Sequence, residues 1–340
     1  MDSEKKSENR INIAIALNRK ALQPAYVMLR SLAINNASHF IYVYVLQSEL
    51  EDRDCLFLQD ALQRDIRGNS IKCIKIDAAQ FSVLPHAYWP VEAYYRLMLP
   101  KLLGGEIDRI LFLDIDIIVN KDIWDFYYTD FEGNLLVAAK DAEFDKRYHR
   151  GMALNTSKLD NWKVFWRGLV EDGMKYFCSG VLLMNLAELK KEYSFQKYVT
   201  TLASIAENVG YPDQDLLNYM HYRQVKIVDE NKFGLVASIA HEMGMSYEDV
   251  QKKVYILHFA GPYKPYRTAE FRYDIEKIWW EYAKDSPFYQ ELLETVFYQS
   301  MEHCLTEEKL LELKDENGTL KEMLGKCQKL IQQLSSRIQS

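Results

Sequence analysis

One stretch, residues 110–119, restricts the fold more than any other, because two acids lie among ten otherwise apolar residues. A buried, unpaired carboxylate costs several kcal/mol or takes up a proton, so we predict a buried strand that ends at Asp114 and Asp116. On a continuing strand the two side chains would face the same side, about 6.7 Å apart. Mg²⁺ or Mn²⁺ would turn their repulsion into attraction. The alternative is a strand-end loop with two solvated aspartates.

Short apolar runs and helical stretches alternate through the first half of the chain. The predicted strands are 11–17, 41–46, 71–76 and the run that ends at the acids, and the predicted helices are 24–36, 51–66 and 92–103. This alternation predicts an α/β fold with a mostly parallel central sheet and helices on both faces. Ligands bind such sheets at the carboxyl ends of the strands, where Asn18 and the acid pair are expected.

The second half is less regular but carries further polar residues at strand ends. Its predicted strands are 135–139, 180–186 and 254–258, and its helical stretches are 187–208, the segment that Pro212 opens, and 268–298. His258 ends a strand and leads into a loop with Gly261 and Lys264, which suits a third metal ligand and a phosphate-binding loop. The alternatives are a hydrogen-bonded histidine and a simple turn. For the aromatic stretch 268–298 we expect packing against the sheet, rather than an acceptor-binding or membrane-surface face.

From residue 305 the composition shifts to Leu, Glu, Lys and Gln, and apolar residues recur at alternating spacings of three and four. The series is Leu310, Leu313, Asn317, Leu320, Leu324, Cys327, Ile331, Leu334 and Ile338. Such a series is the a/d seam of a coiled coil, and one asparagine at an a position fixes the register of two-stranded coils. We predict a homodimer through residues 310–338. The alternative is a lone helix packed against the rest of the chain.

Composition argues against several classes of protein. A net charge of −7 disfavours general nucleic-acid binding. The five cysteines are scattered without a CxxC pair, which favours a reducing compartment and disfavours a disulfide framework or structural zinc. The charged N-terminus lacks a signal peptide's apolar core, and no run of 18 apolar residues is present. We expect a cytoplasmic protein without a transmembrane segment, either free or peripheral at the inner face of the membrane.

Five segments together resemble bacterial members of glycosyltransferase family 8, retaining enzymes that include lipooligosaccharide galactosyltransferases and glycogenin-like proteins. They are AYYRLMLPKLL (93–103), RILFLDIDIIV (109–119), YFCSGVLLMN (176–185), YPDQDLLN (211–218) and LHFAGPYKPY (257–266), in the family's order. The resemblance implies a Rossmann-like nucleotide-sugar domain of the GT-A type. We therefore divide the chain into a polar arm (1–10), the GT-A domain (11–266), an aromatic helical extension (267–304) and the heptad-patterned tail (305–340).

The resemblance also implies a set of site residues. Asp114, Asp116 and His258 would bind Mn²⁺ or Mg²⁺, which holds the diphosphate of a UDP-sugar. The donor-binding residues would be Ala16, Asn18, Arg96, Ile115, Cys178, Ser179, Gly180, Gly261 and Lys264. Asp213 and Gln214 would be the catalytic residues beside the donor sugar, and Asp141 would face the sugar or the acceptor.

Family members retain the anomeric configuration, and the resemblance implies a front-face reaction in which the departing phosphate assists the acceptor hydroxyl. A covalent Asp213 nucleophile is the alternative. Two positions depart from the family pattern: Asn18 replaces an Asp that binds uracil, and Cys178 replaces an Asn near the donor. A thiol is a smaller, more apolar neighbour than a carboxamide, so this change bears on sugar choice or on activity.

We therefore expect a metal-dependent retaining glycosyltransferase that moves glucose or galactose from a UDP-sugar to a saccharide or glycoprotein acceptor. One alternative is an inactive nucleotide-sugar-binding scaffold dimerised by its coiled coil, although decayed enzymes generally lose their metal ligands. Another is a DxD phosphatase of the haloacid-dehalogenase type. That family carries its motif on the first strand, whereas three predicted strands precede Asp114 here.

Overall fold

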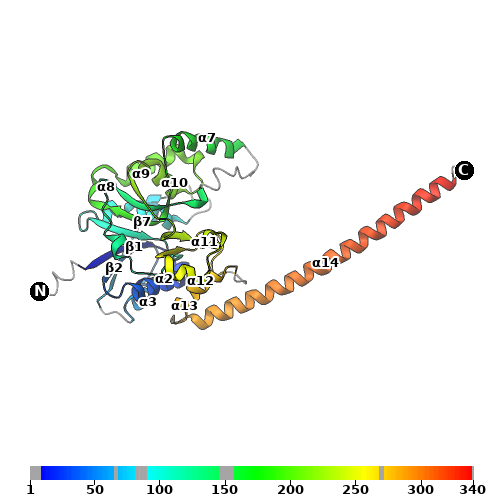
Figure 1. Ribbon diagram of the computed structural model, residues 1–340, viewed down its shortest axis with the longest axis horizontal. Helices are drawn as coiled ribbons and strands as arrows, with labels where there is room; N and C mark the ends of the chain where they lie inside the picture. The colour runs from blue at the N-terminus through cyan, green and yellow to red at the C-terminus, as the bar shows by residue number, and fades with distance from the viewer. Residues whose placement is uncertain are drawn as a thin grey trace. The chain divides into compact units, whose positions relative to one another are not determined.

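The computed structural model describes residues 9–64, 68–81, 84, 90–144, 157–267 and 272–338. The chain divides into two compact units, residues 1–265 with 272–287 and residues 266–271 with 288–340. We call the first unit the body; the second contains one long helix, α14 (Tyr289–Ile338) (Figure 1). The four segments proposed from the sequence remain a prediction, because the two units do not test their boundaries.

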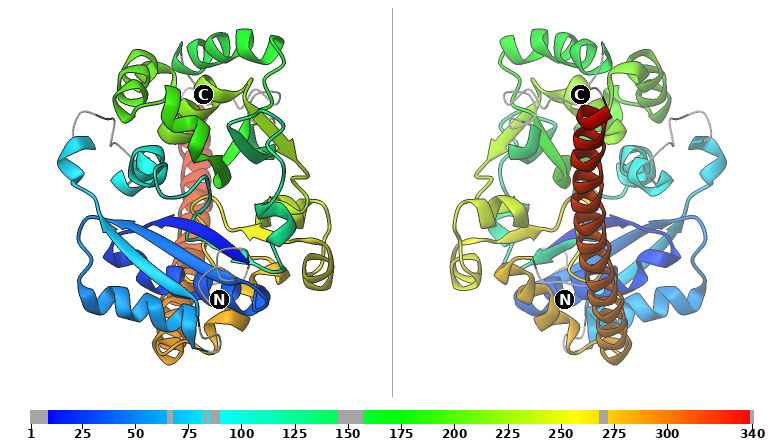
Figure 2. Two further views of the ribbon diagram at one scale, coloured as in Figure 1. Left: turned by 90° about the vertical axis from the view of Figure 1, so that its left-hand side faces the viewer. Right: turned by 90° about the vertical axis from the view of Figure 1, so that its right-hand side faces the viewer.

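A seven-stranded mixed sheet forms the centre of the body (Figure 2). Its strands are β1 (Arg10–Ala16), β2 (Phe40–Gln47), β3 (Ser70–Lys75), β4 (Arg109–Leu113), β6 (Leu136–Lys140), β7 (Phe177–Asn185) and β8 (Val225–Val228). Their spatial order is β3-β2-β1-β4-β7-β6-β8. The first four are parallel and β6 is parallel to β8, while β7 runs antiparallel to both of its neighbours. The prediction of a mostly parallel sheet is confirmed.

Helices cover both faces of this sheet, with α8, α9 and α10 on one side and α2, α3 and α13 on the other (Figure 1). The α-helices of the body are α2 (Leu22–Asn35), α3 (Asp52–Gln63), α4 (Leu99–Leu103), α5 (Trp124–Tyr127), α7 (Ser157–Glu171), α8 (Leu186–Glu192), α9 (Phe195–Ile205), α10 (Pro212–His221), α11 (Ala237–Glu242), α12 (Tyr247–Lys253) and α13 (Lys277–Ala283). Short 3₁₀ helices are η1 (Arg19–Ala21), η2 (Ala78–Phe81), η3 (Val91–Met98), η4 (Ala206–Asn208) and η5 (Asp274–Glu276). Trp279 and Trp280 of α13 are buried, and α13 packs mainly on the helix α2, so this part of the aromatic stretch is packed as expected but on a helix rather than directly on the sheet.

The prediction of a buried strand that ends at the acids is confirmed, and the structure adds a second strand after them. β4 ends at Leu113, and β5 (Ile117–Val119) joins β10 (Ile256–His258) and β9 (Phe233–Val236) in a second sheet. Asp114 N donates to Gly180 O (2.8 Å) in the first sheet, whereas Phe259 N donates to Asp116 O (2.9 Å) beside the second. The two acids therefore lie in the turn between the sheets.

The helix predicted at 92–103 begins instead as the 3₁₀ helix η3 and becomes α-helical only at Leu99. Pro100 contributes at the junction, because it has no N–H with which to bond the carbonyl of Arg96 in an α-helical ladder. Leu99 N donates to that carbonyl, three residues back. The tighter 3₁₀ geometry therefore sets the path of the segment that carries Arg96.

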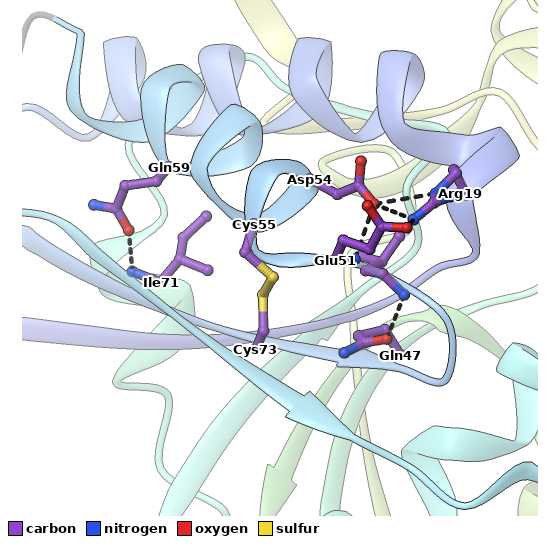
Figure 3. The surroundings of a disulfide bond; sticks show 9 residues. Arg19, Gln47, Glu51, Asp54, Cys55, Gln59, Ile71 and Cys73 are labelled. Carbon is purple, nitrogen blue, oxygen red and sulfur yellow. Dashed lines mark hydrogen bonds and ion pairs between the residues drawn. A yellow bond between two sulfur atoms is a disulfide. The ribbon is translucent and has the colours of Figure 1, made fainter.

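A disulfide joins Cys55 of α3 to Cys73 of β3, which corrects the expectation of unpaired cysteines (Figure 3). The two Cα atoms lie 6.5 Å apart and the residues are 18 positions apart in the chain. Gln59, one turn further along α3, accepts a hydrogen bond from Ile71 N (2.8 Å), so α3 lies along the edge strand. Among the cysteines whose side chains are described, Cys178 is free and buried. The pairing weakens the argument for a reducing compartment.

Helix α14 continues for 50 residues, through Gly318 and Gly325, which agrees with a helical tail. Three residues of the predicted seam, Leu313, Asn317 and Leu320, are exposed. The other predicted seam side chains lie outside the described ones: Leu310, Leu324, Cys327, Ile331, Leu334 and Ile338. The coiled coil itself stays a prediction. In the part of the chain that the structure describes, no helix is both long and apolar enough to cross a membrane.

Candidate functional site

The three predicted metal ligands lie together beyond the carboxyl end of β4. Asp114 and Asp116 lie in the turn after β4, and antiparallel pairing of β10 with β5 brings His258 beside them. Nε2 of His258 lies 3.1 Å from Asp116 Oδ1 and 3.8 Å from Asp114 Oδ2. One ligand atom from each residue lies within 4.8 Å of the others. Two carboxylates and one imidazole form a donor set that suits Mn²⁺.

Gly180 shows that β7 leaves room for this cluster. A Cβ at that position would lie 2.5 Å from His258 Cε1 and 2.6 Å from Asp114 Oδ2, so any other residue would displace both ligands. The missing side chain lets the strand run directly behind the two groups. The residues present therefore fit a divalent cation.

Lys264 brings a positive charge to the same cluster. Its Nζ pairs with Asp116 Oδ2 and donates to Phe259 O (2.7 Å). Burial opposes ionisation of Asp116, but the charges of His258 and Lys264 hold the pKa of Asp116 well below its usual range. Gly261 allows the loop to turn between them, because its φ of 90° lies in the left-handed region that favours glycine.

Arg96 links this cluster to the residues predicted beside the sugar. Its guanidinium is buried and donates to Asp114 Oδ1 (2.8 Å) and to Ser179 O (2.5 Å). Nε of Arg96 lies 3.3 Å from Asp213 Oδ2, and the guanidinium carbon stands 4.1 Å from the centre of the Phe112 ring. Burial raises the pKa of Asp213, although the charge of Arg96 opposes that rise.

Gln214, in the first turn of α10, is held by hydrogen bonds at both ends of its amide. Its Oε1 accepts from Ser179 N (2.9 Å), and its Nε2 donates to Asp141 Oδ2 (2.7 Å), just after β6. The hydroxyl of Ser179 donates to Asp213 Oδ2 (3.2 Å). Hydrogen bonds thus join Ser179, Asp213, Gln214 and Asp141 into one polar network.

Three polar residues that sequence reasoning did not assign hold α10 against β7. The Asp215 carboxylate accepts from Tyr176 OH (2.5 Å), Gly210 N (2.6 Å) and Tyr211 N (2.9 Å). Asn218 accepts from Phe177 N (2.8 Å) and donates to Phe177 O (2.8 Å). Burial, followed by the charge of Asp215, raises the pKa of Tyr176 well above its usual value. The sequence did offer one signal for this role: Asp215 and Asn218 are three positions apart, so they lie on the same face of a predicted helix.

The remaining predicted donor residues lie at the same edge of the sheet. Ala16 ends β1, the neighbour of β4, and Ile115 lies half-buried between the two acids. Asn18 Nδ2 donates to Glu92 Oε2 (3.5 Å) in η3, the helix that carries Arg96. Cys178, predicted near the donor, has its Sγ 3.8 Å from Nδ1 of His258, a contact that the sequence did not indicate.

Comparison with solved structures identifies the fold. The galactosyltransferase LgtC, in complex with donor and acceptor sugar analogues, matches 82% of this chain and 96% of its own, with a TM-score of 0.65 and 20% identity. The glycosyltransferase GlyE of Streptococcus pneumoniae TIGR4 matches 86% of this chain and 64% of its own, with a TM-score of 0.58 and 20% identity. The fold is therefore that of a GT-A glycosyltransferase.

Sequence comparison makes the assignment specific. The sequence model of glycosyl transferase family 8 matches residues 12–269, and the chain belongs to that family of glycosyltransferases. A lipopolysaccharide 1,2-glucosyltransferase of Escherichia coli is 25% identical over 324 residues, covering 88% of this chain and 87% of the relative. A lipopolysaccharide 1,3-galactosyltransferase of Salmonella typhimurium is 23% identical over 285 residues, covering 82% and 80%. The phosphatase alternative is left without support.

Proposed function

We propose that this glycosyltransferase moves glucose or galactose from a UDP-hexose to a saccharide acceptor with retention of configuration, in the presence of Mn²⁺ or Mg²⁺. The observation that carries the proposal is the cluster of Asp114, Asp116 and His258 beside Lys264. The relatives named above are lipopolysaccharide glucosyl- and galactosyltransferases, which supports a hexose donor and a cell-envelope saccharide. A glycoprotein is the other acceptor class to test.

The charges of the cluster suit the stabilisation of a diphosphate leaving group. Breaking the bond between the anomeric carbon and the diphosphate leaves negative charge on UDP. A divalent cation held by the two aspartates and His258 would supply Lewis-acid stabilisation of that charge. Lys264, on the loop after His258, offers a fixed positive charge to the same phosphates. Arg96 holds Asp114 in place through its hydrogen bond.

The contacts of Asp213 favour the front-face reaction over a covalent intermediate. Its carboxylate is buried, pairs with Arg96 and accepts a hydrogen bond from Ser179. Both partners contact the same oxygen, Oδ2, and hold the carboxylate in a fixed position, which favours a role in placing the sugar over attack on the anomeric carbon. We therefore assign Asp213 and Gln214 to the placement of the sugar, while the departing phosphate accepts the proton of the acceptor hydroxyl.

We also propose that two copies of the chain associate through a coiled coil of residues 310–338. The support is a continuous helix across this whole range and the exposure of Leu313 and Leu320, both at predicted d positions. Apolar side chains exposed at regular spacing along a long helix gain stability when a second helix covers them.

The test of the proposed function is UDP release from a panel of UDP-sugars, with Mn²⁺ and with EDTA, first with water and then with saccharides as acceptor. We expect slow, Mn²⁺-dependent hydrolysis of one UDP-hexose and faster turnover with the right saccharide. Release that persists in EDTA would contradict the metal dependence. Metal-dependent UDP binding without release from any sugar or acceptor would support the scaffold alternative.

A further inference from the structure

The imidazole of His258 lies between a sulfur atom and a pair of carboxylates. Nδ1 is 3.8 Å from Cys178 Sγ, whereas Nε2 is 3.1 Å from Asp116 Oδ1. Cys178 is 8% exposed and His258 is 4% exposed, so water has little access to either group. The sulfur therefore lies on the side of the ring away from the carboxylates.

Strand β7 supplies the surface against which this ring packs. Cys178 and Gly180 are two residues apart on the strand, so they face the same side. The first contacts Nδ1, and a Cβ on the second would collide with Cε1 of the same ring. Ser179 faces the other side and contacts Asp213 and Gln214. One strand thus supports the cation cluster with alternate residues and the sugar-side network with the residue between them.

We propose that Cys178 is a positioning residue for His258, whose Nδ1–H donates a hydrogen bond to the sulfur and so keeps Nε2 directed at Asp114 and Asp116. The inference rests on the proposed cation site. Nε2 binds a cation only without a proton, so the ring proton must then be on Nδ1. A buried N–H needs an acceptor, and Cys178 Sγ is in contact with it.

The chemistry of sulfur gives this arrangement a measurable consequence. Histidines that bind metals usually donate their second N–H to a carboxylate, a carbonyl or water. A thiol sulfur is a weaker acceptor than these oxygens, yet it holds the tautomer and the ring orientation. Loss of such a partner typically weakens metal binding about 10–100-fold.

Three substitutions separate the acceptor from the volume that it fills. Cys178→Ala removes both, Cys178→Val removes the acceptor but keeps a side chain of similar size, and Cys178→Ser keeps an acceptor. Mn²⁺ binding to the full-length protein in the presence of UDP is measured by calorimetry. We expect Ala and Val to weaken Mn²⁺ binding about tenfold, and Ser to stay within about threefold of the wild type. Thermal unfolding of each variant verifies that it is folded.

A second readout reports the hydrogen bond itself. With Mg²⁺ and UDP bound, the cation on Nε2 keeps the ring proton of His258 on Nδ1, and ¹H–¹⁵N spectra of the histidine rings should show this proton exchanging slowly with water in the wild type and the Ser variant. In the Val variant the Nδ1–H has no acceptor, so its proton should exchange faster. A Val variant that binds Mn²⁺ as the wild type does, or all three variants weakened equally, would overturn the role of the sulfur. A wild-type protein that fails to bind Mn²⁺ with UDP would instead overturn the cation site, and this inference with it.

Discussion

In α2, ten consecutive residues, 24–33, are buried, whereas α14 exposes apolar side chains along much of its length. The exposed set in α14 is Leu293, Phe297, Tyr298, Met301, Leu311, Leu313, Leu320 and Met323. The packing of α2 supplies its stability, but a helix of 50 residues, about 75 Å long, gains little from propensity alone. The difference indicates that the body buries most of its apolar side chains in a core, whereas α14 presents a series of them to solvent.

Charged side chains show the same contrast. In the body, Arg96 pairs with Asp114 and Asp213 while nearly fully buried, so removal of one partner leaves an unpaired charge in a poorly solvated site. In α14, Lys326 and Glu322 pair at 3.0 Å across one helical turn, but both are largely exposed. Exposed pairs contribute at most about 1 kcal/mol. Changes to charge should therefore matter most in the body.

The largest expected effect is that of Asp116→Asn. The change removes a negative ligand and leaves His258 and Lys264 without their carboxylate. We expect UDP release to fall by more than about 100-fold, and Mn²⁺-dependent UDP binding to be lost in calorimetry. Asp52→Asn, on the exposed start of α3, is the matched control and should leave both unchanged. A fully active Asp116→Asn enzyme would refute the metal assignment.

Local patterns predicted much of the body, because apolar runs identify strands whatever surrounds them. The runs at 11–17, 41–46 and 71–76 correspond to β1, β2 and β3 within one residue at each end. The expectation that ligands bind at the carboxyl ends of strands also pointed to Asp114, Asp116 and His258, which the structure brings together. These features depend on residues close together in the sequence, so a single sequence is enough to predict them.

Features fixed by distant residues were not predictable. The second sheet that follows the acids depends on the pairing of β5 with β10, a strand from a distant part of the sequence. The Cys55–Cys73 pair likewise needs α3 to pack on β3. The contact between Cys178 and His258 joins two elements that no local pattern relates. In each case the contact joins residues that are far apart in the sequence and come together only in the folded protein.

Removal of the disulfide should have an intermediate effect, on stability rather than on chemistry. A cross-link that closes a loop of about 18 residues stabilises a protein by about 3 kcal/mol. We therefore expect Cys55→Ser/Cys73→Ser to lower the free energy of unfolding in urea by about that amount, with UDP release within about twofold of the wild type. Dithiothreitol should destabilise the wild type and leave the double variant unchanged. Equal stability of the oxidised and reduced wild type would show that the bond does not form.

The smallest effect on the body should follow deletion of residues 305–340, because the described side chains of that segment are exposed rather than buried in a core. We expect a monomer by light scattering, with UDP release and the thermal midpoint of the body unchanged. Leu320→Asp, at a predicted d position, should also dissociate the dimer, since it places a charge in the seam. Leu311→Asp, equally exposed but at a b position, should not. A truncated chain that stays dimeric, or equal dissociation by both substitutions, would contradict the heptad seam as the dimer contact.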